Sequence, residues 1–373
     1  EPVASPPAED PGVSKGRTAP WKRILQVVAM LVVLGFIFGG VIPAFADYSD
    51  MIDAVTAMSG WTIAGLAVLA AAYLVEYWFV VMVALPGLRF AEAAVVHTST
   101  TAVVNTVPAG AAISFGLMYA EYYSWGFPPA TTTAALLVTG VWDTMSKIAI
   151  PAIVLAGMAW VTNTPQWWIM AAIAMLGVVI VIGLVVVLLR APRVADRIGQ
   201  WLDRPVNAVL GWFKEDPIDI VAKIRFFRRA SNVIIAGRWW ILTILTVGSQ
   251  LLLVTLLVAS IRAVGVPADV LPFLLILTAY AVARVLAAIP ITPGGLGIVE
   301  VAYLSILTPG VPEEYRAAVA AGVLLFRGLV WFPPVLLGIP ALVFWRVNKS
   351  WRRDATTEPR GPAIEPESAA QTG

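Results

Sequence analysis

Charged side chains stand inside long apolar runs of this sequence, where ionisable groups are rare. Each would cost about 2.5–3.5 kcal/mol at the centre of a helix in lipid, so such residues are expected to face a protein interior and to be paired. Acids and bases both occur among them: Glu76, Asp143, Lys147, Arg284, Glu300 and Arg327. Side chains of these types suit ion pairing, proton transfer or the binding of a charged group, which makes them the first candidates for a functional site.

The spacing of these residues separates two kinds of behaviour. Asp143 and Lys147 are four positions apart and lie on one face of a helix, where they can pair directly. They are candidates for the site, with a purely structural ion pair as the open alternative. Arg284 and Arg327 have no acid at helical spacing, which predicts that they are free to bind phosphate through the planar guanidinium fork.

A break in the chain precedes Glu300. Segment 289–300 reads Ile-Pro-Ile-Thr-Pro-Gly-Gly-Leu-Gly-Ile-Val-Glu within an otherwise apolar run. In lipid, such a break survives only where it is buried in protein or lines a cavity. A helix that resumes after it presents unpaired N–H groups and a positive dipole end, and glycine lets an anion approach these groups closely. The candidate binding residues are Pro293, Gly294, Gly295, Gly297 and Glu300.

Glu300 has two readings at the start of this helix. Its carboxylate can fold back on the free N–H groups as a cap, or it can meet a cationic headgroup or a proton. The cap is the preferred prediction because the residue lies one turn into the resumed helix.

The composition identifies the class of protein. Hydrophobic residues make up 59% of the chain and charged residues only 13%, with a mean hydropathy of +0.83, whereas soluble domains carry about 25% charged residues. Cysteine is absent and histidine occurs once, which excludes disulfides, thiol catalysis and a His-rich metal site. We find no nucleotide-binding or hydrolase motif. We therefore expect an integral membrane protein with no catalytic residues, no metal and no cofactor.

Several apolar segments are long enough to cross a membrane as helices. They are Ile24–Ile42, Trp61–Ala84, Thr131–Trp160, Trp167–Leu189, Trp239–Ile261 and Ala317–Trp345. Two further segments, 93–119 and 272–307, are interrupted by Pro and Gly, and we read each as a re-entrant hairpin. The expected fold is an all-α integral membrane protein with about six full spans plus two re-entrant hairpins.

Polar segments divide the chain into two membrane halves, 21–189 and 239–347. Residues 1–20 and 348–373 read as a disordered arm and a disordered tail, and loop 190–238 is basic and amphipathic. The positive-inside rule places all three in the cytoplasm, with the loop on the inner leaflet of a bacterial plasma membrane. The two hairpins then enter from opposite sides.

The two hairpins also resemble each other in sequence. When Pro108-Ala109-Gly110 is laid on Pro293-Gly294-Gly295, each is followed by a short helix, a turn with proline, and a span with one charge near its middle, Asp143 or Arg327. We predict an inverted-topology repeat, with chance recurrence of Pro-Gly kinks as the alternative. Paired broken segments of this kind point to a transporter site near the midplane, which adds Pro108 and Gly110 to the candidates.

The run Thr292-Pro293-Gly294-Gly295-Leu296-Gly297-Ile298-Val299-Glu300 resembles the signature of the lysylphosphatidylglycerol synthase transmembrane (flippase-like) family. The resemblance covers most of residues 20–350 and carries over Pro293, Gly294, Gly295, Gly297 and Glu300. It implies lipid translocation across the bacterial plasma membrane. The sequence lacks the aminoacyltransferase domain that follows in some members, so we expect a stand-alone member that does not transfer lysine.

Together these observations predict a lipid flippase or transporter. We expect it to move an anionic phospholipid or a polyprenyl-phosphate-linked lipid, with the phosphate held at the midplane by half-helix N-termini, Arg284, Arg327 and Lys147. The expected partners are membrane lipids with anionic headgroups, and no nucleic acid. Two alternatives stay open: a lipid-phosphate transferase or hydrolase with Glu300 or Asp143 as its base, and a non-catalytic scaffold for a membrane glycosyltransferase. Homo-oligomers are compatible with each reading.

Overall fold

The structure is a computed structural model, and it describes residues 35, 39–40, 43, 47–107, 110–212, 217–235, 237–287, 292–353 and 359–362. Over these residues the chain is helical, with no strand. The expected arm 1–20, most of the expected span Ile24–Ile42, and Pro108 lie outside the described residues. The all-α class is confirmed.

Five of the described helices are long and apolar enough to cross a membrane. They are α3 (Gly60–Ala84), α6 (Pro129–Thr162), α7 (Pro165–Arg190), α10 (Trp239–Ala263) and α13 (Glu313–Val347). Each coincides with a span predicted from the sequence. Their starts follow the usual rules for helix N-termini, since Ser59 accepts the Thr62 N–H and caps α3, and α6 and α7 begin with proline.

Two pairs of shorter helices lie between these spans. The first pair is α4 (Phe90–Thr106) and α5 (Gly110–Ser124), and the second is α11 (Phe273–Leu286) and α12 (Ile298–Leu307), which follows a 3-10 turn, η2 (Pro293–Gly295). The longest of these helices, α4, has 17 residues and extends about 25 Å, less than the hydrocarbon core of about 30 Å. None of the four is therefore long enough to cross alone.

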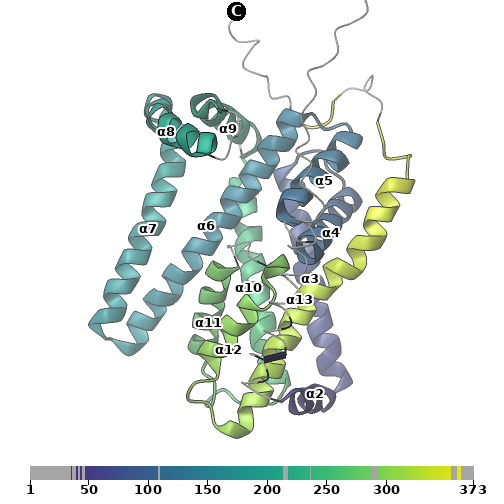
Figure 1. Ribbon diagram of the computed structural model, residues 1–373, viewed down its shortest axis with the longest axis vertical. Coiled ribbons are helices and arrows are strands. Elements are labelled where there is room, and N and C mark those ends of the chain that lie inside the picture. Colours follow the sequence, from purple (N-terminus) through teal and green to yellow (C-terminus); the bar gives the residue numbers. More distant parts are fainter. Residues whose placement is uncertain are drawn as a thin grey trace, which may run out of the picture.

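The two pairs lie toward opposite ends of the molecule. Figure 1 shows α4 and α5 in the upper part, toward the same end as α8 and α9, and α11 and α12 in the lower part, toward the same end as α2 (Tyr48–Thr56). Each half of the chain has the same order of elements, with a span (α3 or α10), two short helices, and a long span (α6 or α13). The long span of each half packs on the first short helix of the other, α13 on α4 and α6 on α11. The repeat itself stays a prediction.

Each pair of short helices belongs to its own hydrophobic core cluster. Trp125 and Phe127, which follow α5, are fully buried in one cluster with residues of α3, α4 and α6. Tyr280 of α11 and Leu304 of α12 are buried in the other, with residues of α10 and α13. Burial of this apolar surface fixes the hairpins against the spans, and so fixes the polar groups near their tips.

The predicted amphipathic loop forms two helices, α8 (Pro192–Trp212) and α9 (Ile220–Ile235). They lie together at one end of the molecule, beside the ends of α6 and α7 (Figure 1). Arg225 joins them by donating from Nε and from one NH2 group to the two carboxylate oxygens of Asp196, each at 3.1 Å. This hydrogen bonding lowers the pKa of the Asp196 carboxyl, so the carboxylate stays charged in neutral and mildly acidic solution.

The polar tail is not disordered throughout. Residues 359–362 pack on the loops that flank α4 and α5, and Thr131 donates its hydroxyl to the Pro362 carbonyl at 3.0 Å. The sequence-based expectation of disorder over 348–373 is wrong for these residues, because specific polar contacts compensate for the low apolar content on which the expectation rested.

Candidate functional site

Glu300 caps α12 and also forms a buried ion pair. Its Oε2 accepts the Gly297 N–H at 2.6 Å, its Oε1 accepts from Arg327 Nε at 2.6 Å, and the side chain is 1% exposed. Arg327 also donates to the Gly294 carbonyl at 2.9 Å. The predicted cap is confirmed. The prediction that Arg327 is free for phosphate is wrong, because its acid partner comes from another helix rather than from helical spacing on its own.

The glycines at this break explain the sequence pattern. Gly294, Gly295 and Gly297 have φ values of 58°, 70° and 85°, which residues with a side chain adopt only with strain. The resulting turn aims the Gly294 carbonyl at Arg327 and the Gly297 N–H at Glu300. These residues therefore shape the break, whether or not they also contact a ligand.

Asp143, Lys147 and Arg284 form a second charged cluster. Lys147 Nζ lies 2.6 Å from Asp143 Oδ2, which confirms the expected pair on one helix face. An NH2 nitrogen of Arg284 lies 3.8 Å from Asp143 Oδ1, an ion pair that is too long for a hydrogen bond. Arg284 Nε is buried and has no hydrogen-bond partner among the described residues. Of the two arginines, Arg284 is thus the one with donors to spare.

The tip of the first hairpin reaches the break of the second. A Cβ placed on Gly294 would lie 2.7 Å from Asn105 Oδ1 of α4 and 3.0 Å from Trp331 Nε1 of α13. Gly110, at the start of α5, turns tightly against α4, since a Cβ there would lie 2.3 Å from the Val103 carbonyl oxygen. The structure therefore brings the two broken segments together.

Unpaired hydrogen-bond donors occur near this meeting point. Trp331 Nε1 and Thr292 Oγ1 are buried and, like Arg284 Nε, lack a hydrogen-bond partner within the part of the chain that the structure describes. Tyr303 of α12 lies close enough to Arg284 and to Arg327 to interact electrostatically with each. Because buried polar groups are normally hydrogen-bonded, a group of unpaired donors suits a ligand rich in acceptors, such as a phosphate.

A polar network between the halves was not predicted from the sequence. Ser249 of α10 donates its hydroxyl to Glu76 of α3, and Tyr280 donates to Gln250 Oε1 at 2.5 Å. Gln250 Nε2 in turn donates to Ser146 of α6 at 3.4 Å. Helical spacing does not reveal these partners because they stand on different helices, and their only sequence signal is a polar side chain within an apolar span.

The contact at Gly294 gives a first testable prediction. We expect Gly294→Ala to lower the thermal unfolding midpoint more than Gly310→Ala does. Both glycines have positive φ, and both substitutions therefore carry about 1–2 kcal/mol of backbone strain. A Cβ on Gly310 meets nothing within 4 Å, so the difference between the variants reports the contact with Asn105 and Trp331. Equal midpoints in detergent would show that the two breaks do not press on each other.

Comparison with known families completes the description of the site. The model of the family described as "Lysylphosphatidylglycerol synthase TM region" matches residues 27–338. The match includes both pairs of short helices and every charged residue of the two clusters, and it ends within α13, before the tail segment 359–362. No curated protein matches the chain.

Proposed function

Because the chain belongs to the lysylphosphatidylglycerol synthase TM region family, we propose that it is a flippase that moves an anionic phospholipid or a polyprenyl-phosphate-linked lipid across the membrane. The observation that carries this proposal is the group of unpaired donors beside the Gly294 break, where the tip of the other hairpin arrives. A phosphate headgroup supplies acceptors for these donors and a negative charge for the nearby cations.

The two arginines take different parts in this proposal. Arg284 binds the phosphate, since its Nε has no hydrogen-bond partner among the described residues and its contact with Asp143 is long. Lys147 adds positive charge from the other side of Asp143. Arg327 is a positioning residue, because Glu300 neutralises its charge and the Gly294 carbonyl takes one of its donors. The pair keeps the break open toward the ligand.

The arrangement of the short helices suits access from both membrane faces. We infer that α4–α5 and α11–α12 are re-entrant hairpins of an inverted repeat that enter from opposite sides, with α8, α9 and both termini in the cytoplasm of a bacterial cell. Their tips meet at one site, as the contact of α4 with η2 supports. Rocking of one half against the other then exposes the site to one face at a time.

No chemical reaction is part of the proposal. Glu300, which an enzyme acting on lipid phosphate would need as a base, already accepts from Gly297 and Arg327 and is 1% exposed. Asp143 is held by Lys147 and Arg284. These partners favour roles in ion pairing and capping for the two carboxylates over the role of a general base.

The proposal is tested by replacing Arg284 in a lipid transport assay. In proteoliposomes with a headgroup-labelled anionic lipid, we expect Arg284→Ala to slow protein-dependent transbilayer movement by about tenfold or more, because hydrogen bonds to charged groups contribute about 1.5–3 kcal/mol. Arg316→Ala is the matched control, since Arg316 lies in the first turns of α13 and bonds only the Val311 carbonyl among the contacts found for its side chain. Equal rates in the two variants would remove Arg284 from the binding site.

A further inference from the structure

The carboxylate of Glu92 lies buried at the base of the first hairpin. Glu92 is in the first turn of α4, its side chain is 1% exposed, and its Oε2 accepts the Arg89 N–H at 2.9 Å. The backbone carbonyls of Gly87 and Trp125 and the ring of Phe127 lie around the same point. A buried carboxylate with two carbonyls and an aromatic face offers what a guanidinium group needs: acceptors in its plane and a ring on its face.

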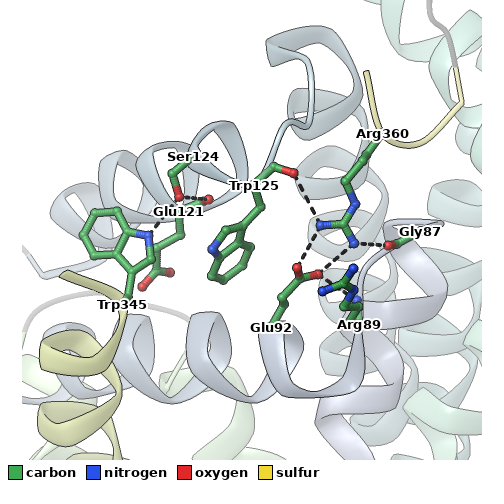
Figure 2. Close-up of polar contacts among 8 residues, drawn as sticks. All are labelled: Gly87, Arg89, Glu92, Glu121, Ser124, Trp125, Trp345 and Arg360. Atoms are coloured by element: carbon green, nitrogen blue, oxygen red, sulfur yellow. Dashed lines mark hydrogen bonds and ion pairs between the residues drawn. The ribbon is translucent and has the colours of Figure 1, made fainter. Parts of the chain in front are cut away.

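Arg360 of the tail fills this position (Figure 2). Its two terminal nitrogens donate to Glu92 Oε1 at 2.8 Å and to Oε2 at 2.9 Å. The same nitrogens donate to the Trp125 carbonyl at 3.3 Å and to the Gly87 carbonyl, and Cζ lies 4.6 Å above the centre of the Phe127 ring. The side chain of Arg360 is only 10% exposed. The pair of Arg360 and Glu92 is therefore buried and bidentate. It differs from an ion pair on the surface, which usually contributes less than about 1 kcal/mol to stability.

The backbone around Arg360 is fitted to the same place. Arg360 N–H donates to the Gly126 carbonyl at 2.9 Å, and the Pro362 carbonyl accepts from Thr131 at 3.0 Å. A Cβ on Gly361 would lie 3.2 Å from the Pro86 carbonyl oxygen, so the glycine permits a close approach. The tail therefore docks through a short segment rather than through one side chain.

The chain uses the same local chemistry at the proposed transport site. In both places a glutamate in the first turn of a short helix accepts a backbone N–H at the helix start and pairs with an arginine from beyond it, Glu300 with Arg327 and Glu92 with Arg360. In both, the arginine also takes a glycine carbonyl from the preceding turn. Arg327 is part of a helix, whereas Arg360 lies in a non-helical segment beyond the end of α13, so it can leave without unfolding a helix.

We propose that Glu92, the Gly87 and Trp125 carbonyls and the Phe127 ring form a guanidinium-binding site whose ligand is Arg360 of the tail. The site belongs to the first membrane half and its ligand follows the last helix of the second. When occupied, it fastens the tail segment to the base of the α4–α5 hairpin and adds to the packing of α13 on α4. When vacated, it frees the tail segment. If the chain transports lipid as proposed above, docking and release of Arg360 would regulate transport from this end of the molecule. This role in transport rests on the proposed function.

The absence of cysteine allows a direct test on the full chain. Spin labels are attached to the double variant Tyr123→Cys/Pro359→Cys in lipid nanodiscs, at two exposed positions on α5 and on the docked segment. We expect one narrow distance population. Arg360→Ala should reduce the ratio of docked to undocked population by about tenfold or more, because in the docked state it leaves the buried Glu92 carboxylate without its ion-pair partner. Arg360→Lys should restore it only in part, since an ammonium lacks the planar fork.

Two further variants complete this test. Glu92→Gln removes the charge but keeps an acceptor for the Arg89 N–H, so it should also release the tail while α4 stays folded. Arg352→Ala is the matched control, because Arg352 is an exposed residue of the same charge that follows α13 and lies outside the docked segment, and the population should not change. An unchanged distance distribution in both Arg360→Ala and Glu92→Gln overturns the proposal, whether or not the chain moves lipid. Loss of the docked population in these two variants supports the proposal even if the unmodified chain moves no lipid.

Discussion

Arg327→Ala is expected to lower the free energy of unfolding by about 3–5 kcal/mol, the effect of leaving one member of a buried ion pair without its partner. Glu300 is 1% exposed, so water does not replace the lost guanidinium. The substitution also removes the donor to the Gly294 carbonyl, which loosens the break itself. Chemical denaturation in mixed micelles measures the change, and lipid movement should fall in parallel because the break is part of the proposed site.

The double variant Glu300→Gln/Arg327→Met separates charge from packing. Its glutamine still accepts the Gly297 N–H, and its methionine still fills space, but no uncompensated charge is left. We expect it to be more stable than Arg327→Ala alone. If Arg327→Ala is as stable as the unmodified chain, the ion pair between Glu300 and Arg327 does not hold α13 against the break, and this part of the account is wrong.

Gly338→Ala is expected to separate α13 from α4. A Cβ at Gly338 would lie 2.3 Å from the Thr98 carbonyl oxygen and 2.5 Å from the Ala102 Cβ. The Thr98 oxygen belongs to the helix backbone, so no side-chain rotation can relieve this overlap. Small residues at such crossings allow membrane helices to approach closely. Relieving the overlap requires helix movement, for which a loss of about 1–3 kcal/mol or more in unfolding free energy is expected. The thermal unfolding midpoint of Gly338→Ala in detergent measures this loss of stability.

Gly328→Ala is the matched control on the same helix. A Cβ there meets nothing closer than the Phe332 ring at 3.6 Å, which is an ordinary contact. Alanine is the better helix former by about 1 kcal/mol, so this variant should be as stable as the unmodified chain or slightly more stable. Equal midpoints for Gly338→Ala and Gly328→Ala would mean that α13 and α4 do not cross as closely as they do in the structure.

The sequence predicts the elements of this fold well, because in a membrane protein apolar length and Pro-Gly breaks determine where helices cross and where they stop. The Pro-Gly interruption of segment 93–119 predicts two short pieces rather than one span, and the segment forms the short helices α4 and α5. The contacts between the halves were not predictable in the same way. The packing of α13 on α4 depends on Gly338, which in sequence looks like any other glycine of a membrane helix.

The candidate site shows the same division between local and distant partners. The Glu300 cap and the pair of Asp143 with Lys147 follow from spacing on one helix, and both were predicted. The partner of Arg327 lies 27 residues away on another helix, which no local pattern reveals. The Arg360 contact was missed for a further reason: a polar tail has the composition of a disordered segment, although its docking depends on one guanidinium in one buried site.

The measurement that tests the proposed function most directly compares two headgroup-labelled lipids with the same acyl chains, one anionic and one zwitterionic, in vesicles with and without the protein. We predict that the protein accelerates transbilayer movement of the anionic lipid, and that the zwitterionic lipid moves at the protein-free rate, because the unpaired donors and the cations Arg284 and Lys147 select a net negative headgroup. No acceleration of phosphatidylglycerol or of a polyprenyl phosphate, or equal acceleration of both labelled lipids, would contradict the proposal that the chain carries anionic lipids through this site.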